Sequence, residues 1–199
     1  LEKCIQENTR AHFRSEIVLN TVDTTIFQYK QRIIEDRYQL LMVSRLEEAK
    51  DIPTMLRALT ILNQRNHIYQ LSIIGRGDPI QYNELIENLH ISDHVKFLGE
   101  QPKNVIAQKM ARSDVFVLSS LWENSPCVIG EALCCGLPVV ATNVGGVPEL
   151  VPANAGKLVP PKDPEALAKA ISDVVEHPDA YERGLIAQQA QSRFSYEAI

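Results

Sequence analysis

The sequence predicts an α/β fold in which a doubly wound parallel sheet carries helices on both faces. Short apolar runs of strand length alternate along the chain with longer segments whose apolar residues recur at helical spacing. Several of these longer segments begin at an Asp-Pro or Ser-Pro pair, which is typical of helix starts. Strands that alternate with helices in this way are typical of a parallel sheet covered on both sides, so the expected architecture is Rossmann-like.

Length and composition fit one such domain. The chain has 199 residues, of which 45% are hydrophobic and 23% are charged, the balance of an ordinary globular domain. A formal net charge of −5 argues against a domain that binds nucleic acid mainly through its phosphates. No apolar run approaches the roughly 18 residues that cross a bilayer, so no transmembrane segment is expected.

The four cysteines predict neither a disulfide nor a metal site. No Cys-x-x-Cys pair occurs among Cys4, Cys127, Cys134 and Cys135. Cys134 and Cys135 are neighbours in a predicted helix and point in different directions, so they cannot easily share a metal. We expect reduced thiols that serve as small core residues, and therefore a reducing cytoplasm.

The expected elements follow one another as strand, helix, strand. Strands are expected at residues 40–43, 71–74, 95–98, 115–118 and 139–141. Helices are expected at residues 52–62, 82–89, 105–110, 126–135, 166–175 and 180–193. Asp78, Ser125 and Asp163 each precede a proline and are expected to cap a helix, and Gly136 is placed to end one.

The domain boundary is expected near the start of the chain. Residues 1–16 are polar and predict a linker or the tail of a missing N-terminal domain. Residues 17–199 form the predicted Rossmann-like domain, which a short strand at 17–20 would open.

The motifs of several common enzyme classes are absent. The first strand-to-helix turn contains no glycine, so it lacks the Gly-x-Gly-x-x-Gly pattern of dinucleotide-binding folds. There is also no phosphate loop of the Walker type, no Gly-x-Ser-x-Gly elbow and no His-Glu-x-x-His helix. The sequence therefore lacks the motifs that nicotinamide-dependent redox enzymes, P-loop hydrolases and serine hydrolases require.

Two glutamates mark the densest candidate site. Glu123 lies in the loop after the predicted strand at 115–118, and Glu131 interrupts an apolar helix where a carboxylate is costly without a partner. Ligands of open parallel sheets bind at the carboxyl ends of the strands, where a helix start also favours anionic groups. Two separated carboxylates could each accept hydrogen bonds from a vicinal diol. The alternative is that both are ordinary surface carboxylates.

Two cations flank the first strand-to-helix turn. Arg45 and Lys50 could clamp a diphosphate and offset the charge that develops on it as a sugar–phosphate bond breaks. The alternative is that Lys50 forms a solvated charged turn with the nearby Glu47 and Glu48.

The ordered series of motifs resembles a known family over nearly the whole chain from Val18. The matching segments are Asn-Thr-Val-Asp at 20–23, Ser-Arg-Leu through Lys at 44–50, Ile-Gly-Arg-Gly at 74–77, the Glu-x7-Glu pattern at 123–131, Gly-Leu-Pro at 136–138 and Gly-Gly-Val-Pro-Glu at 145–149. Together they resemble the donor-binding domain of retaining GT-B glycosyltransferases of the group 1 (family 4) class.

The resemblance implies a role for each matching residue. Arg45 and Lys50 would bind the donor diphosphate, Glu123 with nearby backbone amides would hold the transferred sugar, and Glu131 would bind the ribose hydroxyls. The turn at residues 99–103 would pack on the base. The expected donor-binding residues are Arg45, Lys50, Gly75, Glu123, Asn124, Ser125, Pro126, Cys127 and Glu131. Of these, Arg45, Lys50 and Glu123 are expected to act in catalysis.

The resemblance also implies a reaction and its partners. A nucleotide-diphosphate sugar would be the donor, transfer would retain configuration, and neither a metal nor another cofactor would be needed. A glycan or lipid-linked acceptor would bind the missing N-terminal domain, so the fragment alone is expected to be inactive. Family habit favours polysaccharide or glycolipid assembly in the cytoplasm, with peripheral association at the inner face of the cytoplasmic membrane.

Three departures and two alternatives accompany this reading. Thr21, Ser44 and Asp51 stand where the family commonly has glycine, and Ser44 and Asp51 would make the turn around the diphosphate less open. A nucleotide-sugar epimerase of the same fold, or a non-catalytic module that binds nucleotide sugars, remains open as the alternative function.

Overall fold

A computed structural model describes residues 20–31, 36–64 and 69–198. Its centre is a six-stranded sheet in the order β3-β2-β1-β4-β5-β6, and every neighbouring pair is parallel. The strands are β1 (Tyr38–Val43), β2 (Tyr69–Ile74), β3 (Val95–Phe97), β4 (Val115–Leu118), β5 (Val139–Thr142) and β6 (Gly156–Val159). The predicted Rossmann-like fold is confirmed.

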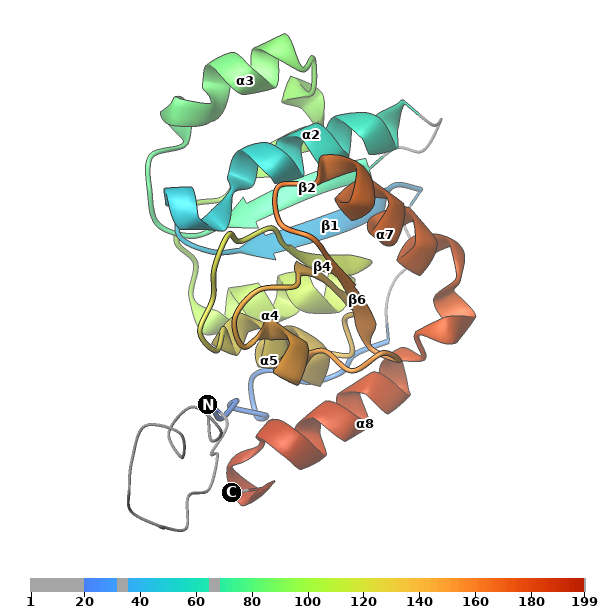
Figure 1. Cartoon of the computed structure of the whole chain (residues 1–199). Coiled ribbons are helices and arrows are strands. Elements are labelled where there is room, and N and C mark those ends of the chain that lie inside the picture. Colours follow the sequence, from blue (N-terminus) through green and yellow to red (C-terminus); the bar gives the residue numbers. More distant parts are fainter. Residues whose placement is uncertain (1–19, 32–35, 65–68, 199) are drawn as a thin grey trace, which may run out of the picture.

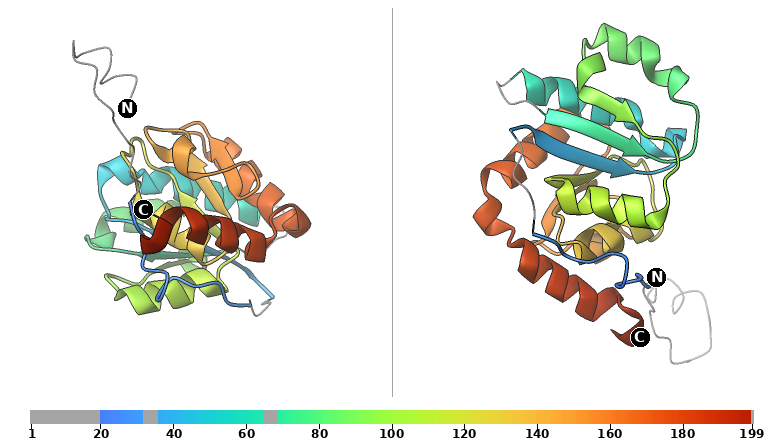
Figure 2. Two further views of the ribbon diagram at one scale, coloured as in Figure 1. Left: turned by 90° about the horizontal axis from the view of Figure 1, so that it is seen from below. Right: turned by 180° about the vertical axis from the view of Figure 1, so that it is seen from behind.

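Helices cover both faces of the sheet. Figure 1 shows α2 and α7 above the sheet and α4, α5 and α8 below it, and Figure 2 shows the same layers from two other sides. The α-helices are α2 (Ile52–Asn63), α3 (Asn83–Asn88), α4 (Lys103–Arg112), α5 (Cys127–Cys134), α6 (Val147–Leu150), α7 (Pro164–Glu176) and α8 (Arg183–Phe194). The 3-10 helices are η1 (Glu48–Lys50), η2 (Pro79–Tyr82), η3 (Ser92–His94), η4 (Pro178–Ala180) and η5 (Tyr196–Ala198).

The central strands read as continuous apolar runs because helices bury both of their faces. All four residues of β4 and all four of β5 are buried, whereas β3, at one edge of the sheet, is only partly buried. In α2 the buried side chains Ile52, Met55, Leu56, Leu59 and Leu62 recur at the spacing that places them on the sheet side. Burial on both faces is therefore what made these elements visible in the sequence.

Several element boundaries differ from the predicted ones. The expected helix at 82–89 is divided between η2 and α3, the helix at 105–110 extends over Lys103–Arg112, and the segment from 180 to 193 reaches its α-helix only at Arg183. Among the strands and α-helices of the described residues, two were not predicted, the edge strand β6 and the short helix α6.

The capping predictions had mixed outcomes. Asp163 accepts a hydrogen bond from the Ala166 amide and caps α7 as expected. Gly136 ends α5 at a φ of +70°, and the following Leu137 amide donates back to the carbonyl of Ala132. The Ser125 prediction was wrong, because the residue before α5 is Pro126 and no side chain caps that helix.

Asp78 behaves as a cap, although not of the element expected. Its carboxylate accepts from the Ile80 amide at 3.0 Å, and the element it caps is the 3-10 helix η2. The predicted linker at 1–16 and the lead-in strand at 17–20 lie outside the described residues, apart from Asn20. Within the described ranges, no helix is both long enough and apolar enough to cross a bilayer.

The strand order fixes where a ligand can enter. β1 lies between β2 and β4, and the connection from β3 to β4 returns along the opposite face of the sheet. The loops that follow β1 and β4 therefore leave the sheet in different directions from neighbouring positions, which opens a crevice at the carboxyl ends of the strands. In Figure 1 these ends, marked by the arrowheads of β1 and β2, point to the left.

Candidate functional site

An ion pair joins the two loops at this crevice. Lys50 ends η1 after β1, Glu123 lies in the loop between β4 and α5, and the distance from Lys50 Nζ to Glu123 Oε1 is 2.7 Å. Both side chains are largely shielded from solvent. The alternative of a solvated turn between Lys50 and the neighbouring glutamates is thus not what the structure contains.

The Glu123 carboxylate is held by a second donor. Ser120 Oγ donates to the same Oε1 atom at 2.7 Å, and the Ser120 carbonyl accepts from Thr142 Oγ1 at 2.6 Å. Ser120 and Thr142 are both buried. The described contacts thus use one carboxylate oxygen twice and leave the other without a protein donor.

The backbone around Lys50 is also tied to the loop after β4. Ser119 Oγ lies 2.9 Å from the Lys50 carbonyl and 3.1 Å from the Asp51 carbonyl, and the Leu121 amide donates to the Ala49 carbonyl at 2.8 Å. These contacts lock the turn after β1 against the turn after β4.

Asp51 shows why glycine is not required after Lys50. Its backbone is left-handed, with a φ of +43°, a conformation that aspartate tolerates better than most residues. Its carboxylate caps α2 by accepting from the Thr54 amide at 3.4 Å, and it also accepts from Thr54 Oγ1 at 2.7 Å. The departure at this position therefore starts a helix and does not obstruct the turn.

A pair of glycines in the loop after β5 packs against the backbone of the Glu123 loop. Gly145 has a φ of +51°, and a Cβ there would lie 1.7 Å from the Glu123 carbonyl oxygen. A Cβ on Gly146 would lie 2.1 Å from the Asn124 carbonyl oxygen. The loop after β5 approaches the Glu123 backbone so closely that only glycine fits.

A pocket of about 300 Å³ lies at the same edge of the sheet, and neither Lys50 nor Glu123 is among the residues that line it. Its lining residues come from the ends of β1 and β2, from the loop after β3 and from α4 and α5, and are Val43, Ser44, Arg45, Ile74, Gly75, Arg76, Glu100, Gln101, Ile106 and Val128. The turn predicted to pack on a base thus contributes two lining residues. Ser44 also brings a buried hydroxyl that has no hydrogen-bond partner among the described residues.

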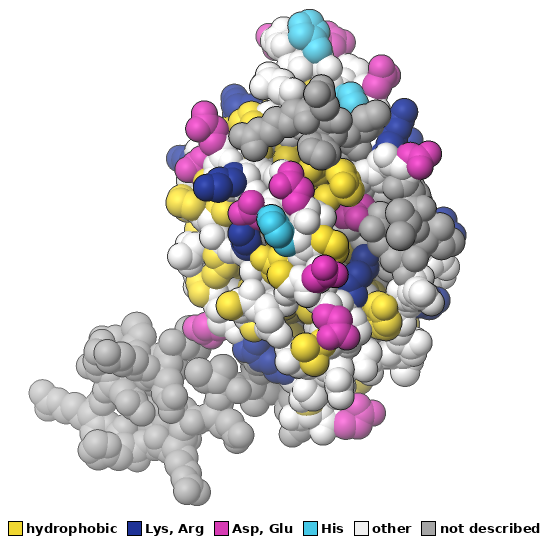
Figure 3. All heavy atoms as spheres, turned by 90° about the vertical axis from the view of Figure 1, so that its right-hand side faces the viewer, with side chains coloured by type: hydrophobic (Ala, Val, Ile, Leu, Met, Phe, Trp, Pro, Cys, Tyr) yellow, Lys and Arg dark blue, Asp and Glu magenta, His cyan; other side chains and the backbone are white. Residues whose placement is uncertain are grey.

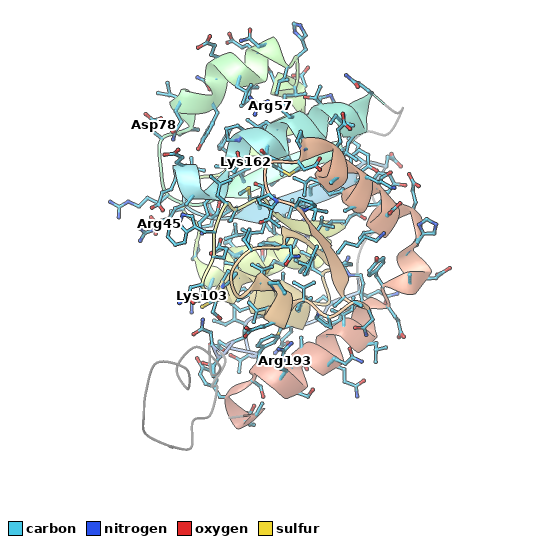
Figure 4. The ribbon with its side chains drawn as sticks, viewed as in Figure 1. Arg45, Arg57, Asp78, Lys103, Lys162 and Arg193 are labelled. Atoms are coloured by element: carbon cyan, nitrogen blue, oxygen red, sulfur yellow. The ribbon has the colours of Figure 1, made fainter. Side chains whose placement is uncertain are left out.

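Two predicted residues, Arg45 and Gly75, line this pocket directly. Arg45 is exposed and pairs with Glu47 at 3.3 Å, and Figure 4 places it at the left edge of the molecule, where the strands end. Gly75 must be glycine, because a Cβ at its φ of +152° would lie 1.8 Å from the Ser44 carbonyl oxygen. In the described chain, Arg45 makes no hydrogen bond or ion pair with Glu123 or Glu131.

Glu131 lies one turn beyond Val128 on α5, partly buried. Burial raises the pKa of the Glu131 carboxyl above its ordinary value, and the positive charge of Lys103 partly opposes that rise. Lys103 begins α4 and lies on the same left-hand side of the molecule as Arg45 (Figure 4). Unlike Glu123, Glu131 has no hydrogen-bond donor within the described residues, so its oxygens can accept from a ligand.

The remaining predicted residues form the approach to α5. Asn20 Nδ2 donates to the Ser125 carbonyl at 2.8 Å and contacts the Ser125 hydroxyl at 3.3 Å, which anchors this loop to the start of the domain. Asn124 and the Cys127 thiol are exposed, and Pro126 precedes the helix. The structure therefore presents Asn124 and Cys127 to solvent beside Glu123.

Sequence reasoning named the ion pair's members but missed what positions them. Ser119, Ser120 and Thr142 received no role, although polar residues directly after an apolar strand were the available signal. Gly145 was quoted only as part of a motif. Its necessity depends on the approach of the Glu123 backbone, which no local pattern reveals.

The arrangement is suited to a ligand that offers both anionic oxygens and hydroxyls. The Lys50 ammonium carries three N–H donors, one of which contacts Glu123, so the others can meet an anion. The free Glu123 oxygen and the Glu131 carboxylate are acceptors for hydroxyl groups. Within the described part of the chain, no three His, Cys, Asp or Glu side chains gather as metal ligands would.

Comparison with known proteins gives consistent matches. The family model described as glycosyl transferases group 1 matches residues 23–192. The amylovoran biosynthesis glycosyltransferase AmsK of Erwinia amylovora is 36% identical over 138 residues, which cover 65% of this chain and 34% of that protein.

Two solved structures share the fold. Sucrose-phosphate synthase from Thermosynechococcus elongatus superposes with a TM-score of 0.84 at 25% identity, covering 99% of this chain and 53% of that one. HepE of Anabaena, in complex with UDP-glucose, gives a TM-score of 0.77 at 25% identity, covering 92% and 54%. The chain thus spans about a third of the length of the curated relative and about half of each solved structure.

Proposed function

The chain belongs to the group 1 glycosyltransferases, and on that premise we propose that it binds a nucleotide-diphosphate sugar beside the Lys50–Glu123 pair. In this proposal the chain is the donor-binding half of a GT-B enzyme, and a second domain binds the acceptor. The observation that carries the proposal is the 2.7 Å contact between a lysine and a glutamate at the switch point of the sheet. The UDP-glucose complex of the structural relative HepE supports the choice of donor class.

Each subsite follows from the groups already described. Lys50 and Arg45 bind the diphosphate, and their positive charge stabilises the negative charge that grows on it as the sugar leaves. The free oxygen of Glu123 accepts hydroxyls of the transferred sugar, and Glu131 accepts those of the ribose. Gly75 lets the backbone approach the diphosphate closely, and Glu100 and Gln101 lie where the base would pack.

The proposed reaction moves the sugar from the diphosphate to the acceptor hydroxyl. The bond between the sugar's anomeric carbon and the diphosphate oxygen breaks, and a bond from that carbon to the acceptor hydroxyl oxygen forms on the same face, so configuration is retained. The acceptor's proton passes to the departing diphosphate. This chain's residues bind, orient and neutralise charge in that step, and the reaction proceeds without a metal.

The setting of the reaction remains a proposal of the same kind. Polysaccharide assembly is supported by the similarity to AmsK, an amylovoran biosynthesis glycosyltransferase, and the acceptor is then a glycan or lipid-linked glycan bound by another domain. A cytoplasmic location with peripheral membrane association stays a prediction. The buried thiols Cys134 and Cys135, which are not joined to each other, fit a reducing compartment.

Thermal unfolding in the presence of sugar nucleotides tests the proposal. A ligand that binds only the folded state raises the melting temperature. Melting should be followed with UDP-glucose, GDP-mannose and ADP-glucose, each at millimolar concentration and each beside its nucleoside diphosphate. At least one sugar nucleotide should raise the Tm, and Lys50→Met should make that rise clearly smaller. A panel in which no compound moves the Tm of the folded protein would reject donor binding.

A further inference from the structure

Two adjacent serines follow β4, and each one contacts a different half of the ion pair. Ser119 and Ser120 are both 0% exposed. Ser119 contacts the backbone around Lys50, and Ser120 contacts the carboxylate of Glu123. Most buried hydroxyls in proteins are hydrogen-bonded, and both of these serines have such partners.

Ser120 determines which oxygen of Glu123 is available. Its hydroxyl and the Lys50 ammonium both donate to Oε1, each at 2.7 Å. Two donors on one oxygen restrict the rotation of the carboxylate, and Oε2 has no donor among the described residues. Thr142 holds the Ser120 carbonyl at 2.6 Å, so the serine itself is attached to the end of β5.

Ser119 fixes the position of the Lys50 backbone. Its hydroxyl lies within hydrogen-bond distance of both the Lys50 and the Asp51 carbonyls, at 2.9 and 3.1 Å. The second of these residues has the left-handed backbone that ends η1 and begins α2. The contact therefore sets the point from which the lysine side chain reaches Glu123.

We infer that Ser119 and Ser120 are positioning residues that hold the diphosphate and sugar subsites in fixed register. Ser119 acts on the diphosphate side through Lys50, and Ser120 acts on the sugar side through Glu123. The inference rests on the proposed function and deepens it. It predicts that the two serines, although adjacent in the chain, affect different parts of the same donor.

A matched serine elsewhere in the fold provides the control. Ser172 on α7 is also buried, and its hydroxyl donates to Glu176 Oε1 at 2.6 Å. Ser172→Ala thus removes a part-buried serine-to-glutamate hydrogen bond of nearly the same length on a different element. Any effect that comes only from the loss of a buried hydroxyl should appear in Ser120→Ala and Ser172→Ala alike.

The binding experiment uses the complete protein that carries this chain. Isothermal titration should compare UDP with UDP-glucose, and GDP with GDP-mannose, for Ser119→Ala, Ser120→Ala and Ser172→Ala. Ser120→Ala should weaken the sugar nucleotide about tenfold and leave the free diphosphate within about twofold. Ser119→Ala should weaken both about tenfold, and Ser172→Ala neither.

Equal losses of diphosphate and sugar nucleotide in Ser120→Ala, or no loss in either serine variant, would overturn the positioning roles. If Ser120→Ala does not fold, Thr142→Val takes its place, because it keeps the Ser120 hydroxyl and removes only the bond to its carbonyl. Thr142→Val should weaken the sugar nucleotide in the same direction by a smaller factor.

A crystal structure of Ser120→Ala separates this inference from the proposed function. The Glu123 carboxylate should rotate away from the place it occupies in the wild-type protein, while the backbone of the Lys50 turn stays fixed. An unmoved carboxylate would refute the inference even if the wild-type protein binds UDP-glucose. Conversely, a rotated carboxylate in a protein that binds no sugar nucleotide would refute the proposed function and leave the positioning role intact.

Discussion

Two lysine–carboxylate pairs in this molecule have almost the same length and very different surroundings. Lys50 lies 2.7 Å from Glu123, and Lys157 lies 2.6 Å from Asp173. The first pair has side-chain exposures of 21% and 9%, whereas the second has 37% and 35%. A short ion-pair distance alone therefore does not mark a functional site.

The pairs also differ in what they connect. The Lys157–Asp173 pair joins the edge strand β6 to α7, elements that follow each other in the chain. That hydrogen bond raises the pKa of Lys157 and lowers the pKa of Asp173, as expected for a pair on the surface. The Lys50–Glu123 pair joins loops 73 residues apart across the switch point. Topology, and not local sequence, brings these two residues together.

The face turned away from the strand ends contrasts with the site. Figure 3 views the side that lies at the right of Figure 1, where acidic and basic side chains are interspersed among apolar ones in the coloured part of the surface. Isolated exposed pairs on such a face contribute little to stability. The candidate site instead holds a shielded ion pair whose carboxylate accepts a hydrogen bond from a buried hydroxyl.

Removing the carboxylate from each pair should give the largest contrast. In the complete protein, Glu123→Gln should lower the rate of nucleoside-diphosphate release from the sugar donor at least about 100-fold. The reason is that the variant loses the carboxylate that is proposed to bind the transferred sugar in the transition state. Asp173→Asn should change the rate less than about twofold. The rates should be followed as UDP or GDP release with cell membranes supplied as acceptor. Similar losses in both variants would remove the distinction between the two pairs.

A second contrast compares two glycines with left-handed backbones. Gly145→Ala places a Cβ 1.7 Å from the Glu123 carbonyl oxygen, whereas a Cβ on Gly99 meets nothing within 4 Å. Gly99→Ala should cost about 1 kcal/mol of unfolding free energy from backbone strain alone. Gly145→Ala should cost at least about 3 kcal/mol and also weaken donor binding, since the Glu123 loop must move.

Urea unfolding followed by circular dichroism would measure both glycine variants. Equal costs for Gly145→Ala and Gly99→Ala would mean that the loop after β5 does not hold Glu123 in place. The result would then point to backbone strain as the whole effect at both positions.

The sequence predicted the fold where burial is strong and missed it where burial is weak. The runs in β1, β2, β4 and β5 were found because both faces of those strands are covered. The strand β6 was not predicted because Gly156 and Lys157 interrupt its apolar run. Gly156 is required there, because a Cβ would lie 1.9 Å from the Val139 carbonyl oxygen.

The candidate site was likewise predicted only in part. Lys50 and Glu123 were visible as charged residues within recognisable motifs, but their contact with each other depends on β1 and β4 being neighbours. The contacts of Ser119 and Ser120 depend on the same neighbourhood, so spacing along the chain could not assign them. Strand order is the physical information that a local pattern lacks.

Glu131 provides the smallest predicted effect, and the direction of its pKa shift is opposite to that of Asp173, whose pKa is lowered by Lys157. Burial raises its folded-state pKa above the ordinary value of 4.5, so the unfolded chain loses that proton first as the pH rises. The stability associated with this carboxyl is therefore full below pH 4.5 and lost as the pH rises through the folded-state pKa.

Glu131→Gln should consequently gain stability relative to the wild-type protein between pH 4 and pH 7, by less than about 1 kcal/mol because the group is partly exposed. Urea unfolding at a series of pH values would measure the difference. A gain that is the same at every pH would show that ionisation of Glu131 does not carry it. The same variant should still lose affinity for the nucleoside diphosphate if Glu131 binds the ribose.

The most direct test of the account compares the two lysines as ligand-binding groups. Isothermal titration of UDP-glucose, GDP-mannose and ADP-glucose should be carried out on the wild-type protein, Lys50→Met and Lys157→Met. We expect the affinity for the sugar nucleotide that binds the wild-type protein to fall at least about tenfold in Lys50→Met and to be unchanged in Lys157→Met. Equal affinities in the two variants would contradict the placement of the donor at the Lys50–Glu123 pair.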